Sequence, residues 1–98
     1  MILIAQTSHQ AIRRIDTPCE FWVRDEEGPL DLGEYSVEVG AIAYGGRHVR
    51  ETWPAQGGAD GRVEFTVPAE TRLDAGLYQL RARFPAGELV HFGLLELV

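Results

Sequence analysis

The chain has 98 residues and a formal net charge of −6, with 45% hydrophobic and 24% charged residues. This length supports one hydrophobic core and not two, and the composition is that of a folded globular protein rather than a disordered one. Binding to nucleic acid needs a basic face, so we expect protein partners and no nucleic acid.

No apolar run approaches the roughly 20 residues that span a bilayer, and the opening MILIAQT lacks the length and basic flank of a signal peptide. We therefore expect no membrane partner and no secretion by a signal of the chain's own. The single cysteine, Cys19, excludes an internal disulfide. Packing and backbone hydrogen bonds must hold the fold.

The N-terminal quarter of the chain predicts three strands. Residues 2–6 and 11–15 are the first two, and the whole segment 1–15 either pairs within the domain or reaches as an arm to a neighbour. The third, residues 19–24, alternates with a period of two. Phe21 and Val23 are predicted to face the core, and the residues between them face outward.

The middle of the chain predicts one long and one short strand. Residues 35–44 alternate apolar and other residues, and Gly40 marks either a bulge or the close approach of another backbone. Residues 47–53 predict a short polar edge strand. Residues 54–61 are rich in turn formers and predict a loop.

The C-terminal part gives the clearest alternation. Arg62–Val67 places every second residue inward, and residues 77–84 do the same. A glycine turn at 85–88 then predicts a hairpin with residues 89–98. Turn formers recur about every ten residues, which is typical of an all-β sandwich or barrel. Seven to eight strands are best buried as two antiparallel sheets packed face to face, with Greek-key connections.

Residues 73–80, Leu-Asp-Ala-Gly-Leu-Tyr-Gln-Leu, resemble the segment with which immunoglobulin-like domains enter their penultimate strand. In such domains the tyrosine hydroxyl bonds back to the backbone near the corner. The resemblance therefore implies a structural tyrosine corner made by Asp74, Gly76 and Tyr78. The simpler interpretation is an ordinary turn followed by a core aromatic residue.

The same resemblance implies that Leu80 stands where extracellular members carry a disulfide cysteine, opposite Cys19 or Phe21. An apolar pair in place of the disulfide suits a reducing compartment. Cys19 itself is expected to be a buried, inert thiol. The predicted fold class is therefore all-β, an immunoglobulin-like antiparallel β-sandwich of seven to eight strands that forms one domain over residues 1–98.

The sequence predicts no catalytic residue, no cofactor and no metal site. His9, His48 and His91 are the only imidazoles, and none stands at ligand spacing from another histidine, cysteine or acidic cluster. Ser8 beside His9 does not make a nucleophile and base pair, because neighbours in a strand point to opposite faces.

An acidic cluster surrounds the Gly28-Pro29 turn. Oxygen-rich loops sometimes hold calcium, but this spacing fits no recognised calcium loop, and a solvated turn is the preferred interpretation. The members of the cluster are Asp25, Glu26, Glu27, Asp31 and Glu34.

Four residues are candidates for a protein interface: Trp22, Trp53, Arg47 and Arg50. Trp22 falls on the outward phase of its strand, and Trp53 on a polar edge strand or loop. Tryptophan and arginine are enriched at interface hot spots. The alternative is that each tryptophan covers one end of the small core.

Several segments, taken in order, resemble the small immunoglobulin-like modules of tailed-bacteriophage structural proteins, such as the N-terminal domain of baseplate upper proteins and tail-tip components. These segments are FWVRDEEG at 21–28, PLDL at 29–32, GRVEFTV at 61–67, LDAGLY at 73–78 and the Phe92-Gly93 pair. The resemblance covers residues 17–98.

This resemblance implies a non-enzymatic virion protein, assembled in the host cytoplasm, that docks tail-tip, baseplate or fibre components to one another. Its partners would be other phage structural proteins, and repeated copies in a symmetric assembly would add avidity. Because the last predicted strand runs to Val98, we expect a small connector rather than one domain of a receptor-binding fibre.

Two other functions stay open. One is a capsid decoration protein of the same fold. The other is an inhibitor whose acidic surface mimics nucleic acid and blocks a host enzyme, which the net charge of −6 motivates. Catalysis is the least supported function, because the sequence shows no recognisable combination of catalytic residues.

Overall fold

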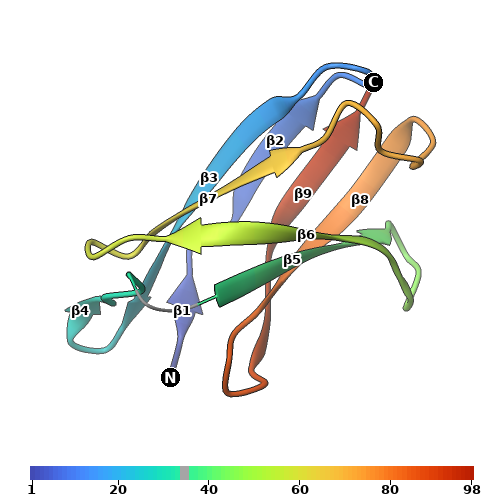
Figure 1. The fold of residues 1–98 in the computed structure, drawn as a ribbon. Coiled ribbons are helices and arrows are strands. Elements are labelled where there is room, and N and C mark those ends of the chain that lie inside the picture. Colours follow the sequence, from blue (N-terminus) through green and yellow to red (C-terminus); the bar gives the residue numbers. More distant parts are fainter. Residues whose placement is uncertain (34–35) are drawn as a thin grey trace.

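The computed structural model describes residues 1–33 and 36–98 of the chain (Figure 1). These residues form β-strands and no helix, so the prediction of an all-β fold is confirmed. It follows that these residues contain no helix that could cross a membrane. The strands are β1 (Leu3–Ile4), β2 (Thr7–Ala11), β3 (Thr17–Asp25), β4 (Gly28–Pro29), β5 (Ser36–Ala43), β6 (Val49–Gly57), β7 (Arg62–Val67), β8 (Gly76–Arg83) and β9 (Leu89–Leu97).

The strands form one continuous, curled sheet in the order β1-β3-β7-β6-β5-β8-β9-β2, and β4 adds to β3. All pairs are antiparallel except β2 with β9, which is parallel. β6 makes the sheet continuous, because it pairs with β5 along most of its length and with β7 over its last three residues, Ala55–Gly57. In Figure 1, β5 and β6 run across the other strands and turn the sheet back on itself.

The core fills the concave side of this sheet. Several strands contribute every second residue, and β7 shows the predicted alternation most clearly, with Val63, Phe65 and Val67 buried. Aromatic rings occupy the centre, where Phe21 and Phe92 stack with their centroids 4.0 Å apart. Burial of apolar surface at about 25 cal/mol per Å² is the main stabilising contribution for a domain without a disulfide.

The N-terminal segment differs from its prediction. β1 pairs with the end of β3, and β2 pairs with β9, so both N-terminal strands lie within this chain's own sheet. The predicted strand at 11–15 is wrong, since residues 12–15 form a turn. The polar run Thr7–Ala11 becomes a strand because β9 supplies backbone partners, and such pairing overrides weak local β-propensity.

The predicted strand at 47–53 is confirmed over residues 49–53, but it is not an edge strand, and the predicted loop at 54–61 is wrong over residues 54–57. β6 runs without a break from Val49 to Gly57 and lies inside the sheet. Pro54 pairs opposite Glu38 of β5 within the strand, so this proline does not end it. The outward residues of β6 are exposed, which is why the sequence of this segment resembles a polar turn. They are Arg50, Thr52, Pro54 and Gln56.

Two further predictions concern β5 and the last hairpin. The register of β5 against β6 shifts between Ala41 and Ile42, next to the predicted bulge at Gly40. The neighbour that approaches Gly40 is a side chain, that of Val49. The predicted first residue of this strand, Tyr35, lies outside the described residues. The hairpin of β8 and β9 is confirmed.

Candidate functional site

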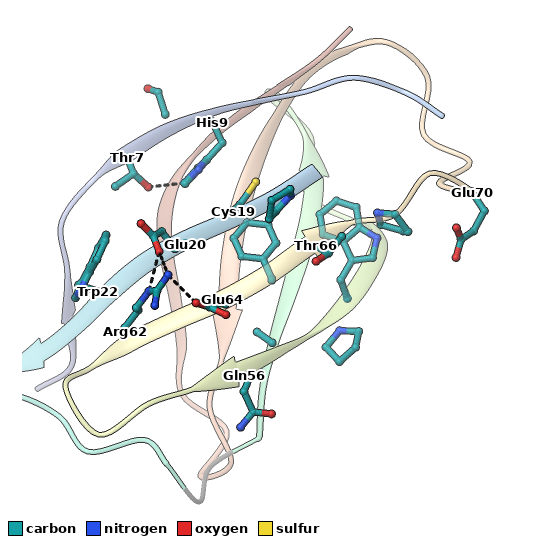
Figure 2. A pocket seen from close by; sticks show the side chains of 17 residues that line it. Thr7, His9, Cys19, Glu20, Trp22, Gln56, Arg62, Glu64, Thr66 and Glu70 are labelled. Atoms are coloured by element: carbon teal, nitrogen blue, oxygen red, sulfur yellow. Dashed lines mark hydrogen bonds and ion pairs between the residues drawn. The ribbon is translucent and has the colours of Figure 1, made fainter. Parts of the chain in front are cut away.

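A wide hollow lies over β3, β7 and the second half of β6, and it reaches the edge of β2 (Figure 2). Its volume is about 1280 Å³. Most side chains that project into it come from the outward phase of these strands. They include Glu20 and Trp22 of β3, Gln56 of β6, and Arg62, Glu64 and Thr66 of β7.

A charged cluster forms the floor of the hollow. In the register of β3 and β7, Glu20 stands opposite Glu64, and two carboxylates so placed would repel each other. The Arg62 guanidinium prevents this by binding both. Its Nε and Nη2 lie 2.7 and 2.6 Å from Glu20 Oε2, and Nη2 lies 2.6 Å from Glu64 Oε1. Figure 2 shows these contacts as dashed lines.

The hydrogen bond to Glu20 raises the pKa of the Arg62 guanidinium above its ordinary value, and the charges of Glu20 and Glu64 act in the same direction. The three side chains are about half exposed, and exposed ion pairs add little to stability. The cluster's effect is therefore positional. It holds a guanidinium and two carboxylates close together on the outward side of β3 and β7.

Trp22 stands beside this cluster, directly opposite Arg62 in the strand register. Its side chain is 51% exposed, which confirms the predicted outward orientation. An indole that combines a large apolar face with one N–H donor is a frequent anchor at protein interfaces. Trp22 and the charged cluster thus make a mixed apolar and polar surface of the kind that docks proteins.

Trp53 also lines the hollow, but its side chain is buried, so its prediction as an exposed interface residue is wrong. Its side chain is 4% exposed and stacks parallel to the Phe65 ring, with 6.3 Å between the centroids. The reason is that residues 49–57 form a strand whose odd-numbered positions face the core. Within the described residues, the Trp53 Nε1 donor is buried without a hydrogen-bond partner, which costs about 1–3 kcal/mol.

Arg47 and Arg50 are exposed but lie outside the hollow. They belong to the β5–β6 turn and the first half of β6, whereas the hollow uses the second half. Of the four predicted interface residues, the structure therefore places only Trp22 at the hollow with its side chain exposed. Sequence reasoning missed Glu20, Arg62 and Glu64, although their outward phase in alternating strands was a usable signal.

His9 connects β2 to the aromatic core. Its Nε2 lies 2.8 Å from Thr7 Oγ1, and its ring packs edge-on against Phe65 and Phe92 at 5.9 and 6.4 Å between centroids. Burial lowers the pKa of His9, which favours the neutral imidazole at pH 7. Burial raises the pKa of the Cys19 thiol, which opposes formation of a nucleophilic thiolate.

Tyr78 makes the hydrogen bond that a tyrosine corner requires. Its hydroxyl donates to the backbone carbonyl of Asp74 at 2.6 Å, and its ring is buried at the start of β8. Leu80, two residues further, is fully buried. On the opposite side of the core, Phe21 is fully buried and Cys19 is 9% exposed.

Two carboxylates of the acidic cluster accept hydrogen bonds from the turns that carry them, and a third, that of Glu26, lies 3.1 Å from the N-terminal ammonium of Met1. Asp25 accepts a hydrogen bond from the Glu27 amide at 2.8 Å, and Asp31 accepts one from Gly33 at 3.0 Å. Glu34 lies outside the described residues. Across residues 1–33 and 36–98, no three histidine, cysteine or acidic side chains gather closely enough to hold a metal ion.

The hollow thus offers a half-exposed tryptophan, a fixed guanidinium and fixed carboxylates, all on strands with buried inner faces. These groups suit recognition of a protein surface, because the sheet fixes them before a partner arrives. In comparisons with known proteins, no family model and no curated protein matches this chain.

Proposed function

We propose that this chain is a non-enzymatic immunoglobulin-like adaptor of a tailed bacteriophage or prophage particle. It docks tail-tip, baseplate or fibre components to one another and resides in the virion. The observation that carries the docking role is the half-exposed Trp22 beside the Arg62 cluster in the hollow. The phage setting rests on the resemblance of residues 17–98 to tail and baseplate modules.

The strand pairing supports the immunoglobulin-like part of the proposal. β1, β3, β7 and β6 follow one another as the strands of one immunoglobulin sheet do, and β5, β8 and β9 follow the order of the other. The hydroxyl of Tyr78 reaches back four residues to Asp74, as in a tyrosine corner. This chain departs from the family pattern in β6, which pairs with both halves.

Two features of the hollow support the docking role, an apolar face that a partner can cover and charged groups that can orient the partner. A partner that covers Trp22 removes its exposed apolar face from water, and such tryptophans are frequent hot spots. The charged cluster adds direction, because Arg62, Glu20 and Glu64 present donors and acceptors in fixed places. Charged groups around an apolar anchor favour the correct partner and its orientation more than they add affinity.

The test is capture of partners from lysate of phage-producing cells, with size-exclusion chromatography, light scattering and mass spectrometry of what co-elutes. The wild type should recover tail or baseplate proteins. Trp22→Ala should lower that recovery by about tenfold, which corresponds to the loss of a modest hot spot. Tyr44→Ala is the matched control, because Tyr44 is 62% exposed and lies outside the hollow.

Other outcomes point elsewhere. Recovery of capsid proteins alone would favour the decoration protein of the same fold. Recovery of a host nuclease or polymerase would favour the acidic inhibitor. If the Trp22→Ala variant captures the same tail proteins as the wild type, the hollow is not the docking surface.

A further inference from the structure

The turn between β2 and β3 exposes an unusual set of side chains. Ile12 and Ile15 are 52% and 56% exposed, and the two residues between them, Arg13 and Arg14, are exposed as well. The Ile15 amide donates to the Ile12 carbonyl at 3.3 Å and closes the turn. We call residues 12–15 the basic turn.

Arg14 in the basic turn has a φ of 72°, the only positive φ of a non-glycine residue in the described parts of the chain. For a residue with a side chain, this conformation costs about 1 kcal/mol or more, and glycine or asparagine is the usual occupant. Strained residues of this kind are concentrated at functional sites. The strain at Arg14 therefore agrees with a binding role for the basic turn.

A small cavity of about 190 Å³ lies at another part of the surface. Among the described residues, its apolar walls include Leu30, Leu32, Phe84 and Ala86, and the carboxylate residues Asp31 and Glu88 also line it. An apolar cavity of about 150 Å³ is large enough for a benzene-sized group, so this one accommodates an isoleucine side chain. We call it the acidic-rimmed cavity.

The basic turn and the acidic-rimmed cavity lie at opposite ends of the molecule. The basic turn comes directly before β3. Leu30, which lines the cavity, comes shortly after β3 ends at Asp25, so β3 separates the two surfaces. A strand of this length spans about 30 Å. Figure 1 shows the β2–β3 connection at the top, and β4 with the β8–β9 turn at the bottom. One copy cannot bring the two surfaces together, but two copies can.

We propose that copies of this chain associate head to tail, with the basic turn of one copy in the acidic-rimmed cavity of the next. An isoleucine of the turn enters the apolar cavity, and the arginines face Asp31 and Glu88 on its rim. The turn offers apolar and basic side chains, and the cavity offers apolar walls and carboxylates, so the two surfaces are complementary in polarity and charge. Such an interface is heterologous, so it generates rings if the rotation closes and filaments if it does not.

This proposal uses none of the residues of the Trp22 hollow and stands independently of the adaptor function. The two would operate together in a particle that repeats the adaptor around an axis. Because the paired charges lie on exposed surfaces, salt should screen them, and association should be stronger at low ionic strength.

The test is sedimentation velocity of the full chain over a concentration series at low and high salt. The wild type should form dimers and larger species as its concentration rises. The double variant Arg13→Glu with Arg14→Glu reverses the charges of the basic turn, and we call it the tip reversal. It changes the net charge by −4, from −6 to −10. The rim reversal Asp31→Arg with Glu88→Arg changes it by +4, from −6 to −2. Each reversal alone should weaken association at least about tenfold.

Charge rescue gives the decisive result. A mixture of the tip and rim reversals should associate as the wild type does, because each acidic turn then meets a basic rim. A chain that carries both reversals should also associate, and its net charge is again −6. Arg47→Glu with Arg50→Glu is the matched control for charge, since it also gives −10 but changes neither surface; it should leave association unchanged.

One further variant guards against misfolding, because Asp31→Arg also removes the hydrogen bond to the Gly33 amide. Ala86→Trp adds a large side chain at an exposed residue of the cavity lining, where it should obstruct entry, and it keeps every rim charge. It should abolish association while circular dichroism and the melting temperature stay close to those of the wild type. A wild type that stays monomeric at every concentration, or a mixture that fails to restore association, would overturn the proposal.

Discussion

At the scale of single residues, the Tyr78 hydroxyl fixes the entry into β8 by its bond to the Asp74 carbonyl. Tyr78→Phe keeps the ring in the core and removes only this bond, which leaves a partly buried carbonyl without its donor. We expect the free energy of unfolding to fall by about 1 kcal/mol. Urea denaturation followed by circular dichroism measures this loss.

The matched control for this prediction is Tyr44→Phe. Tyr44 is 62% exposed, so removal of its hydroxyl should leave the free energy of unfolding within about 0.5 kcal/mol of the wild type. Equal effects from the two variants would show that the bond of Tyr78 contributes nothing specific to the corner.

At the scale of elements, the parallel pairing of β2 with β9 depends on Gly93. A Cβ at this position would overlap the backbone carbonyl oxygen of Thr7, its partner in the register. Because the obstacle is backbone, only a shift of the whole strand would relieve it. Gly93→Ala should therefore lower the free energy of unfolding by about 2–3 kcal/mol.

Hydrogen exchange locates that loss, because the amides of β2 should lose protection more than those of β5 in the same Gly93→Ala variant. Gly58→Ala is the control. Its added Cβ meets an oxygen of the Asp60 side chain at 3.3 Å and no closer atom, so a shift of a few tenths of an ångström relieves the contact, although that oxygen also accepts a hydrogen bond from the Arg62 amide. If Gly93→Ala melts as the wild type does, the close approach of β2 and β9 is not a packing constraint.

At the scale of the whole molecule, stability should depend on pH through His9, which joins β2 to the aromatic core. Burial lowers the pKa of His9 in the folded chain below its ordinary value of 6.5, so the unfolded chain binds the proton more readily. Stability is then fully present above pH 6.5 and declines as pH falls from there toward the lower, folded-state pKa.

The measurement is the free energy of unfolding at pH 7.5 and pH 5.5 for the wild type and His9→Gln. Carboxylates contribute a similar acid dependence to both proteins, so the difference between them isolates His9. The wild type should lose more stability on acidification than His9→Gln. His91→Gln, a change at an exposed histidine, should behave as the wild type.

The sequence by itself determined the features that depend on local alternation and on one local motif. Val63, Phe65 and Val67 alternate with polar neighbours, and a strand buried on one face is the direct consequence. The turn before Tyr78 and the glycine turn before β9 likewise depend on residues close together in the chain. The outward position of Trp22 followed from the same period of two.

Only the tertiary structure decided the features that need a distant partner. Residues 7–11 form a strand because β9 lies beside them, and Trp53 is buried because β6 continues through Pro54 between β5 and β7. The charged cluster needs the register of β3 against β7, and the acidic-rimmed cavity needs the β8–β9 turn beside the segment after β4. Pairing between strands that are distant in the sequence brings these residues together. Local propensity and residue spacing do not predict such contacts.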